Sequence, residues 1–398
     1  MNISILLPYK ENYSQSNAGA VSIFVNDTVK ISKYRKSINV YGSTESKDVL
    51  SNYKNINFNK KFFQSSSEEY LKSYIKHTKK LNIDLIEIHN RPHYVHFLKD
   101  KINYKKFLYF HNDPLKMNGS RTVNERIKLI ENTDKIIFNS FWSKSRFLID
   151  LTNKINSSHL VVVHQSTSKT TVNFREKKKI ISFVGKLNES KGYDIFGKAI
   201  IKILKKYPDW KALVIGDEPR QKFYFTHKNL LHAGFKKNSY ILNKLKEVSI
   251  AVVPSRWDEP FGRSSLEAAS RGCAIIMSNT GGLSETTKHS IIIKNLNHLE
   301  LYNKIDFLIK KPKKRLELQK KIFKNFVLDN KNASDKIDAI RQNYIIKNIA
   351  INRSNLKNLK ILHITNFNQR FDGRLHYNTG KRINNGLIRL GHNVLTLS

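Results

Sequence analysis

Short apolar runs alternate with stretches of helical period along the first 165 residues of the chain. Each run is bounded by polar or turn-forming residues, which is typical of buried strands. Residues 20–33 and 68–81 instead repeat their apolar positions with helical spacing. This alternation predicts an α/β fold with a mostly parallel sheet covered by helices on both faces. The expected strands are residues 3–7, 37–41, 85–89, 107–110, 135–139 and 160–163.

A second series of the same kind follows residues 165–179, a polar stretch without periodicity that we predict to be a linker. Two doubly wound domains joined in this way place a ligand cleft between them, at the carboxyl ends of their strands. We predict Rossmann-like domains over residues 1–168 and 176–332. The clearest helix of the second series is 193–207, and its expected strands are 180–184, 212–215, 230–234, 249–253, 274–278 and 291–293.

The end of the chain repeats the pattern of its beginning. After helical stretches at 299–310 and 314–327, a helix over residues 333–350 is expected to cross back onto the first domain. A strand, a loop holding Gly373, a helix at 377–390 and a second strand then follow. We expect residues 356–398 to be the truncated start of a second Rossmann-like domain, with a private C-terminal extension as the alternative.

The composition suits globular domains but adds a large positive charge. Apolar residues make up 39% of the 398 residues, and 71 Lys and Arg against 32 Asp and Glu give a net charge of +39. This excess attracts phosphorylated ligands, anionic lipid headgroups or nucleic acid. Because the charges are scattered, a bias toward solvated lysines explains them equally well. The densest group, Lys310 to Arg315 with Lys320, Lys321 and Lys324, suits an anionic membrane surface.

The cellular location follows from what the sequence lacks. The single cysteine, Cys273, allows no internal disulfide and favours a reducing compartment. Residues 1–7 lack the charged start and long apolar core of a signal peptide. No stretch approaches the 18 apolar residues of a membrane span. We expect a cytoplasmic protein, at most peripheral at the inner face of the membrane.

The strongest candidate for chemistry is the segment from residue 249 to residue 272. A buried-strand pattern is followed by a loop holding Gly and Pro and by a helix that stops at Gly272. The loop delivers Phe261, Gly262 and Arg263 to the helix N-terminus, where free N–H groups favour an anion. Gly262 has no side chain, which lets a phosphate or hydroxyl approach the backbone closely.

Two carboxylates frame this helix N-terminus. Glu259 lies in the loop, where it can accept hydrogen bonds from sugar hydroxyls. Glu267 lies about one turn into the helix, where it can bind a ribose diol. Such a pair would be uninformative alone, but the strand, loop, glycine and helix all occur in the required order.

This segment, Glu-Pro-Phe-Gly-Arg-Ser-Ser-Leu-Glu-Ala-Ala-Ser-Arg-Gly-Cys-Ala-Ile-Ile from residue 259, resembles the signature of glycosyltransferase family 4. Gly-Gly-Leu-Ser-Glu from residue 281 and Phe-Val-Gly-Lys-Leu-Asn-Glu-Ser-Lys-Gly from residue 183 are also similar to that family. The resemblance covers roughly residues 1–350 and is most specific over 180–290. It implies the GT-B fold, two doubly wound Rossmann-like domains facing a cleft, and a retaining hexosyltransferase that needs no metal or other cofactor.

The resemblance also implies roles for residues of the second domain. Glu259 would bind the hydroxyls of the donor sugar and Glu267 the ribose, while Phe261, Gly262 and Arg263 would supply backbone donors. Lys186 and Lys191 would neutralise the leaving diphosphate, with Lys191 and Glu259 counted as catalytic. The family often has arginine where Lys186 stands, so a bidentate clamp would become a point charge.

Two residues of the first domain would complete the donor site. His111, expected at the carboxyl end of a strand, would be catalytic and contact the transferred sugar, although a hydrogen-bonded strand-end histidine is the alternative. Gly19 resembles the glycine that comes close to the donor phosphates. The family often has two glycines there, whereas this chain has Asn17-Ala-Gly-Ala20.

A metal site is the less favoured interpretation of three nearby histidines. His89, His93 and His96 have suggestive spacing, but His89 ends a predicted strand and only the other two can share a helical face. No Asp-x-Asp cluster ends a strand either. We expect His89 to His93 to belong to the cleft wall, on the acceptor side.

The predicted reaction is transfer of a sugar from a UDP- or GDP-linked donor to a glycan or lipid-linked glycan, as in polysaccharide or lipopolysaccharide biosynthesis. The predicted partners are the nucleotide-sugar, that acceptor and an anionic membrane surface, with no nucleic acid. The competing hypothesis is a non-catalytic, basic nucleotide-fold protein that binds nucleic acid or an anionic membrane. It is disfavoured because no nucleic-acid motif with interleaved aromatic residues is visible.

Overall fold

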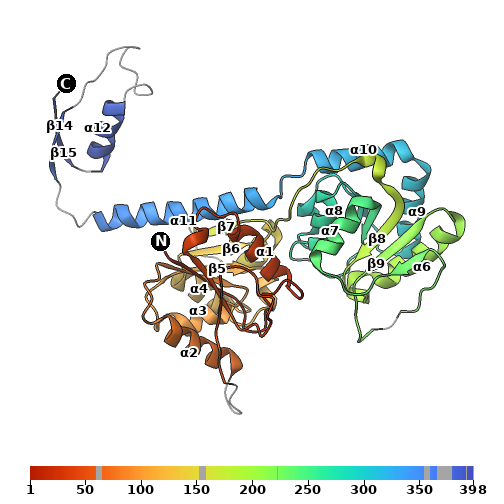
Figure 1. Ribbon diagram of the computed structural model, residues 1–398, viewed down its shortest axis with the longest axis horizontal. Helices are drawn as coiled ribbons and strands as arrows, with labels where there is room; N and C mark the ends of the chain where they lie inside the picture. Colours follow the sequence, from red (N-terminus) through yellow and green to blue (C-terminus); the bar gives the residue numbers. More distant parts are fainter. Residues whose placement is uncertain are drawn as a thin grey trace. The chain divides into compact units, whose positions relative to one another are not determined.

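The computed structural model describes residues 1–59, 65–151, 158–221, 223–353, 359–364, 379–390 and 392–397 (Figure 1). The chain divides into two compact units, Met1–Lys336 and Ile337–Ser398. The first unit contains two parallel sheets, each covered by helices. None of the helices within the described ranges is long and apolar enough to cross a membrane.

The first sheet has seven parallel strands in the order β3-β2-β1-β4-β5-β6-β7. Its strands β1 and β4 are buried throughout, as expected for a sheet covered on both faces. The strands are β1 (Ile3–Leu6), β2 (Ile38–Gly42), β3 (Tyr53–Asn55), β4 (Leu85–His89), β5 (Lys105–Phe110), β6 (Lys135–Phe138) and β7 (Leu160–Val162).

Local signals fix where the helices of this domain begin. Thr122 and Glu125 form a capping box at α4, Ser140 caps α5, and Pro92 occupies the first turn of α3. The helices are α1 (Ala20–Val29), α2 (Ser66–Thr78), α3 (Pro92–Leu98), α4 (Val123–Asn132) and α5 (Phe141–Leu148).

The second sheet has six parallel strands in the order β10-β9-β8-β11-β12-β13. The strands are β8 (Lys178–Val184), β9 (Lys211–Ile215), β10 (Leu230–His232), β11 (Val248–Val253), β12 (Ala274–Ser278) and β13 (Ile291–Ile293). The helices are α6 (Tyr193–Lys206), α7 (Asn238–Glu247), α8 (Arg263–Ser270), α9 (His298–Lys310) and α10 (Pro312–Lys324).

The segment predicted to be a linker is packed against the protein. Gln165, Ser166 and Thr167 are all buried. Thr167 forms a β-bridge with Asp329, and its N–H donates to the carbonyl oxygen of Leu328 at 3.2 Å. The segment joins β7 to β8 with only a short 3-10 helix, η3 (Phe174–Glu176), as regular structure, so it connects the two sheets as predicted, but its beginning is packed against a distant stretch of chain.

Helix α11 (Asn330–Arg353) starts against the first domain, although its first residues follow the second in sequence. Asn330 Nδ2 donates to Asp27 Oδ2 at 3.1 Å, and Ser334 Oγ donates to the carbonyl oxygen of Thr28 at 2.9 Å. Both partners lie on α1. The return of the chain to the first domain thus begins three residues earlier than the predicted helix at 333.

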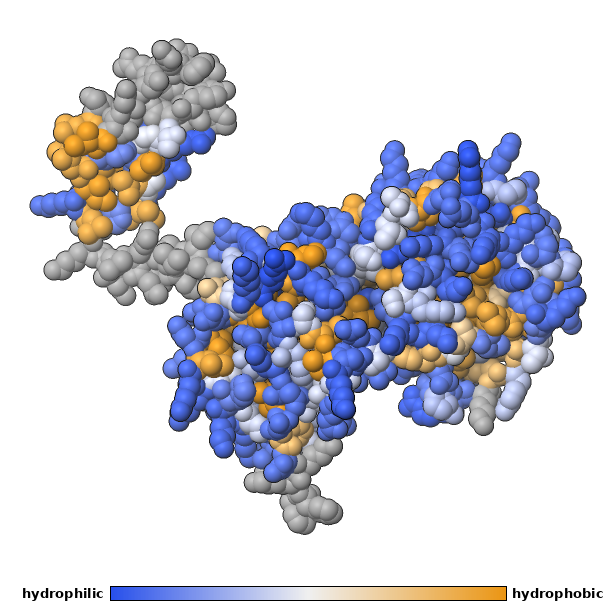
Figure 2. Space-filling view, viewed as in Figure 1, coloured by the Kyte–Doolittle hydropathy of each residue, from blue (hydrophilic) through white to orange (hydrophobic). Residues whose placement is uncertain are grey.

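The second unit contains a parallel β-α-β arrangement. Strand β14 (Lys360–Ile364) pairs with β15 (Asn393–Leu397), and α12 (Thr379–Arg389) lies between them in sequence. The loop with Gly373 lies outside the described residues. Apolar side chains gather on this unit, where Leu362, Ile364, Leu395 and Leu397 are exposed (Figure 2). That residues 356–398 start a second Rossmann-like domain stays a prediction.

Candidate functional site

A cavity of about 870 Å³ lies between the two sheets of the first unit, at the carboxyl ends of their strands. One wall comes from the first domain, with residues of α1 and with His111 and Asn139 just beyond β5 and β6. The other wall comes from the loops after β8 and β11 and from α8. The cations that line the cavity outnumber the carboxylates: they are Lys30, Lys186, Lys191, Lys236, Lys237 and Arg263, against Asp27, Glu259 and Glu267.

Helix α8 begins at this cavity because Gly262 allows a sharp change of direction. Gly262 has φ of 102°, a left-handed conformation that disfavours any residue with a Cβ. A Cβ there would also overlap the side chain of Leu283. Phe261 is buried, with its ring centroid 5.4 Å from that of His164, and this packing anchors the turn. The first N–H groups of α8 therefore lie at the cavity wall.

Glu259 is held by one of its two oxygens. Oε1 accepts from Lys191 Nζ at 2.5 Å and from Ser255 Oγ at 2.9 Å. Only 8% of the residue is exposed, and no described residue donates to Oε2. The carboxylate is thus buried, oriented and left with one free acceptor at the cavity.

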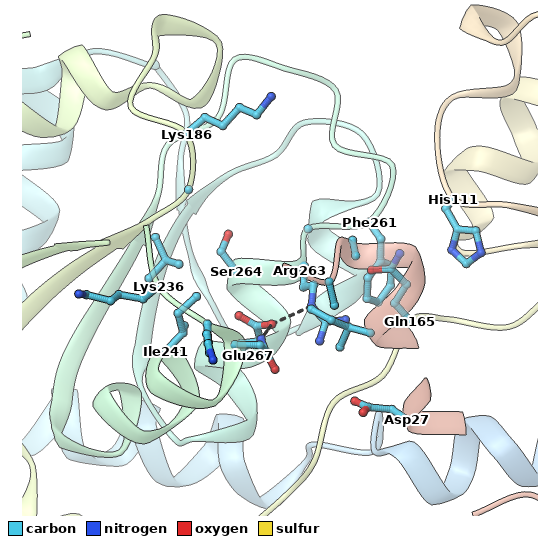
Figure 3. A pocket seen from close by; sticks show the side chains of 18 of the residues that line it. Asp27, His111, Gln165, Lys186, Lys236, Ile241, Phe261, Arg263, Ser264 and Glu267 are labelled. Carbon is cyan, nitrogen blue, oxygen red and sulfur yellow. Dashed lines mark hydrogen bonds and ion pairs between the residues drawn. The ribbon is translucent and has the colours of Figure 1, made fainter. Parts of the chain in front are cut away.

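Glu267 shows the same arrangement. Oε1 accepts from Asn238 Nδ2 at 2.6 Å and lies 2.8 Å from Arg263 Nε in an ion pair. Burial raises the pKa of Glu267, while Arg263 and Asn238 act in the opposite direction. Figure 3 shows Arg263 and Glu267 facing each other, with His111 across the cavity. Sequence reasoning missed Asn238, which lies on another helix and gives no local signal.

The two predicted lysines occupy different positions. Lys186 follows Gly185 at the end of β8 and lines the cavity, and its ammonium makes no ion pair with any described residue. Lys191 instead pairs with Glu259. Its backbone is fixed by Asn188, whose side chain accepts from the Lys191 N–H at 3.0 Å. Lys186 is therefore available to an anionic ligand, whereas Lys191 already neutralises a carboxylate.

His111 lies at the cavity end of β5 in a layer of stacked rings. Its Nε2 is 3.0 Å from His89 Nδ1, and its backbone N–H donates to Asn90 Oδ1 at 3.1 Å. Burial lowers the pKa of His111 to about 3. The imidazole is consequently neutral at physiological pH and available for hydrogen bonding.

This burial predicts a pH dependence of stability. Because the folded-state pKa is below the ordinary 6.5, the contribution of His111 is fully present above pH 6.5 and is lost as pH falls toward about 3. When the pH is lowered from 7 to 5, the free energy of unfolding should therefore fall about 2 kcal/mol less in His111→Gln than in the unmodified protein. Denaturant unfolding at both pH values measures this difference. Replacing the exposed His77 by Gln is the control, and an equal change in both variants would contradict the account.

Gly19 is in close contact with the side chain of Glu11. It precedes α1, and a Cβ there would lie 2.5 Å from Glu11 Oε1. The same oxygen accepts from the Ser22 N–H at 3.1 Å. The N-terminus of α1 thus already has a carboxylate partner from this chain, and a donor phosphate at Gly19 stays a prediction.

The three histidines considered for a metal site point to different partners. His89 stacks on Tyr109 and contacts His111, whereas His96 Nε2 lies 2.9 Å from the carbonyl oxygen of Gly119. Burial lowers the pKa of His93 to about 4. Within the described ranges, no group of three or more His, Cys, Asp or Glu side chains is arranged to hold a metal ion.

The second domain matches a known protein family. Residues 165–325, which carry Lys186, Lys191, Glu259 and Glu267, match the family described as "Glycosyl transferases group 1". Residues 165–325 are a group 1 glycosyltransferase domain. The resemblance to glycosyltransferase family 4 is thereby confirmed.

Curated relatives are similar to this chain over part of their length. The putative glycosyltransferase YtcC of Bacillus subtilis is 24% identical over 253 residues, which are 56% of this chain and 62% of that protein. The lipopolysaccharide core biosynthesis mannosyltransferase LpcC of Rhizobium leguminosarum is 28% identical over 116 residues, 27% of this chain and 33% of that protein. The chain thus spans less than two thirds of the relatives it matches.

Solved structures show that the fold is GT-B. Sucrose-phosphate synthase of Thermosynechococcus elongatus superposes with a TM-score of 0.67 at 15% identity, over 87% of this chain and all of that one. Anabaena HepE in complex with UDP-glucose gives 0.63 at 14% identity, over 86% and 99%. The predicted α/β fold with two Rossmann-like sheets is therefore confirmed.

Proposed function

We propose that this group 1 glycosyltransferase transfers a hexose from a nucleotide-sugar donor to a glycan or lipid-linked glycan, with retention of anomeric configuration. One observation carries the proposal. Two buried carboxylates, Glu259 and Glu267, flank the N-terminus of α8, and each has one oxygen held by the protein and the other without a described donor. A ligand with an anionic group at its centre and hydroxyl groups on both sides of it would complement this arrangement.

The proposed contacts give the donor a single orientation along the second-domain wall of the cavity. The ribose diol donates to Glu267, the diphosphate lies against the backbone N–H groups of Gly262 and Arg263, and the sugar hydroxyls donate to Glu259. Preorganised N–H groups stabilise the charge that develops on the leaving diphosphate and need no rearrangement during the reaction. Lys191 holds Glu259 in place, and its contact with the leaving diphosphate stays a prediction.

His111 approaches the donor from the other wall. Since it is neutral, it can hydrogen-bond to the transferred sugar without repelling the positive charge that develops at the anomeric carbon. Glu259 is engaged with Lys191 and Ser255, so we assign it to sugar binding and not to nucleophilic attack. Retention then follows from attack on the face that the diphosphate leaves, with the leaving phosphate accepting the acceptor proton.

The proposed donor and acceptor are inferred from the proteins to which this chain is similar. HepE was crystallised with UDP and with UDP-glucose, LpcC is a lipopolysaccharide core mannosyltransferase, and a structural neighbour is the lipopolysaccharide outer core galactosyltransferase WaaB. We therefore propose a UDP- or GDP-linked hexose and an acceptor of the cell-surface glycan class. The basic surface suits catalysis at an anionic membrane on its cytoplasmic side.

Lys186 provides a test of where the diphosphate lies. Its ammonium is free for the phosphate farther from the ribose, so Lys186→Ala should weaken binding of UDP about tenfold and leave binding of UMP nearly unchanged. Titration calorimetry with both nucleotides measures this difference. Lys205→Ala, on the exposed side of α6, is the control. Equal weakening of UDP and UMP would place the β-phosphate elsewhere.

Turnover of a panel of UDP- and GDP-hexoses tests the proposed function. We expect release of the nucleoside diphosphate from one donor, slow with water and faster with an extract of lipid-linked glycans. No release from any donor would contradict the proposal. Salt-dependent binding of nucleic acid or of anionic vesicles by an inactive protein would then favour the competing hypothesis of a basic binding protein.

A further inference from the structure

A carboxylate of the second domain caps a helix of the first domain. Glu285 lies in the short 3-10 helix η5 (Leu283–Thr286), and α5 begins at Phe141. Glu285 Oε2 accepts from the Phe141 N–H at 2.7 Å, and Oε1 accepts from the Trp142 N–H at 2.8 Å. These are the first N–H groups of α5, which have no partner within the helix. The positive end of the helix dipole adds to the attraction.

His164, which follows β7, completes the cap. Its Nε2 lies 2.9 Å from Glu285 Oε2, and each of the two side chains is only 18% exposed. Burial raises the pKa of Glu285, but hydrogen bonds from His164, Trp142 and Phe141 more than offset it, and the pKa lies below its usual range. Glu285 is therefore a partly buried charge whose three donors all come from residues before the second sheet.

On the second domain, the Glu285 segment is joined to the backbone of Glu259. The Gly282 N–H donates to the Glu259 carbonyl oxygen at 2.6 Å. A Cβ at Gly281 would lie 2.6 Å from the Glu259 backbone nitrogen, and one at Gly282 would lie 2.6 Å from the Pro260 carbonyl oxygen. The Glu285 segment and the Glu259 loop are therefore in direct backbone contact, so a shift of one displaces the other.

On the first domain, the capped end of α5 is joined to His111. Ser143, in the first turn of α5, donates through Oγ to Asn139 Oδ1 at 2.7 Å. Asn139 Nδ2 donates in turn to the His111 carbonyl oxygen at 3.0 Å. Through the backbone of the first turn of α5, these hydrogen bonds connect Glu285 with the strand end that carries His111.

We propose that Glu285 is a positioning residue, which holds the loop of Glu259 against the strand end of His111. It thereby fixes the position of the two cavity walls relative to each other for sugar transfer. The inference rests on the proposed transferase function. The nucleotide contacts proposed above are made by the second domain alone. Loss of the cap should therefore lower kcat and leave nucleotide affinity intact.

The backbone donor can be removed without disturbing the helix. Phe141 is the first residue of α5, a position at which proline is favoured, and Ser140 before it has φ of −157° and ψ of 160°, which a following proline tolerates. Phe141→Pro deletes the N–H that Glu285 accepts. Phe141→Ala keeps the N–H and removes the exposed ring, and is the matched control.

For Phe141→Pro we expect kcat to fall about 10- to 100-fold, in line with misplacement of reacting groups by about 1 Å. UDP binding should change less than twofold, and Phe141→Ala should keep near-normal kcat. Equal kcat in the two variants would overturn the inference. A loss of UDP affinity as large as the loss of kcat would also overturn it, since Glu285 would then act on the donor pocket itself.

Glu285→Gln is a second test of the positioning role. Glu317→Gln, on the exposed face of α10, is its control. The amide places a donor where an N–H now donates. We expect the same split between kcat and UDP affinity, and an increased radius of gyration in small-angle X-ray scattering with UDP. An unchanged radius and kcat would refute the role of Glu285. If the unmodified protein turns over no donor, the transferase proposal fails, while scattering still tests whether Glu285 fixes the position of the two cavity walls relative to each other.

Discussion

Replacement of Glu259 by alanine is expected to lower kcat/KM for the donor about 10³-fold, or ~4 kcal/mol of transition-state stabilisation. The change removes the buried acceptor for the sugar hydroxyls and leaves Lys191 Nζ without its 2.5 Å partner. An unpaired ammonium beside the reacting sugar would oppose the positive charge that develops there. Because Glu267 and the N-terminus of α8 are untouched, UDP affinity should change less than threefold.

Asp258→Ala is the matched control for this variant. Asp258 precedes Glu259 in the same loop but is exposed and does not line the cavity. We expect near-normal turnover of the donor for it. A similar loss in both variants would indicate that the loop, and not the Glu259 carboxylate, was disturbed, and a loss below threefold for Glu259→Ala would contradict the assigned role.

The second large effect is expected for Gly281→Ala. Gly281 has φ of 60°, and its absent Cβ would lie 2.6 Å from the Glu259 backbone nitrogen and would overlap the Glu259 carbonyl oxygen. The loop of Glu259 must therefore shift to accommodate a methyl group. We expect kcat to fall about 100-fold, the effect of moving a positioning group by about 1 Å. Steady-state kinetics with the accepted donor, together with thermal melting, measures the change.

Gly234→Ala separates this clash from backbone strain. Gly234 also has positive φ, 67°, but a Cβ there meets nothing within 4 Å. It should cost only the left-handed strain, about 1 kcal/mol of folding free energy, with turnover preserved. If the two glycine variants lose the same stability and the same activity, the packing of Gly281 on Glu259 does not matter for catalysis.

The fold was predictable because its strands are buried on both faces. Such strands stand out as runs made mostly of apolar residues, and buried β4 and β12 were found with their observed bounds, as was the partly buried edge strand β13. The edge strand β3 was missed, because two of its three residues are exposed and carry no apolar pattern. Helix ends were less well predicted: α1 stops at Val29, four residues before the expected end, because packing and not periodicity decides the last turn.

Some residues of the site could be predicted from a local sequence pattern, whereas others depend on contacts between distant parts of the chain. Glu259, Gly262 and Glu267 lie within nine residues of one another, so a strand–loop–helix pattern places them together. The partners that orient them come from elsewhere in the chain. Asn238 is 29 residues from Glu267, and the Phe141 N–H is 144 residues from Glu285. A backbone donor has no side-chain identity, so no residue type in the sequence indicates it.

We propose that a nucleotide-sugar donor binds around α8, between Glu259 and Glu267. A crystal structure with the nucleoside diphosphate that the protein binds, UDP or GDP, tests it most directly. We expect ribose hydroxyls within hydrogen-bonding distance of Glu267 and the diphosphate against the N–H groups of Gly262 and Arg263. A nucleotide bound away from α8, or one whose ribose does not contact Glu267, would show that the donor binds elsewhere.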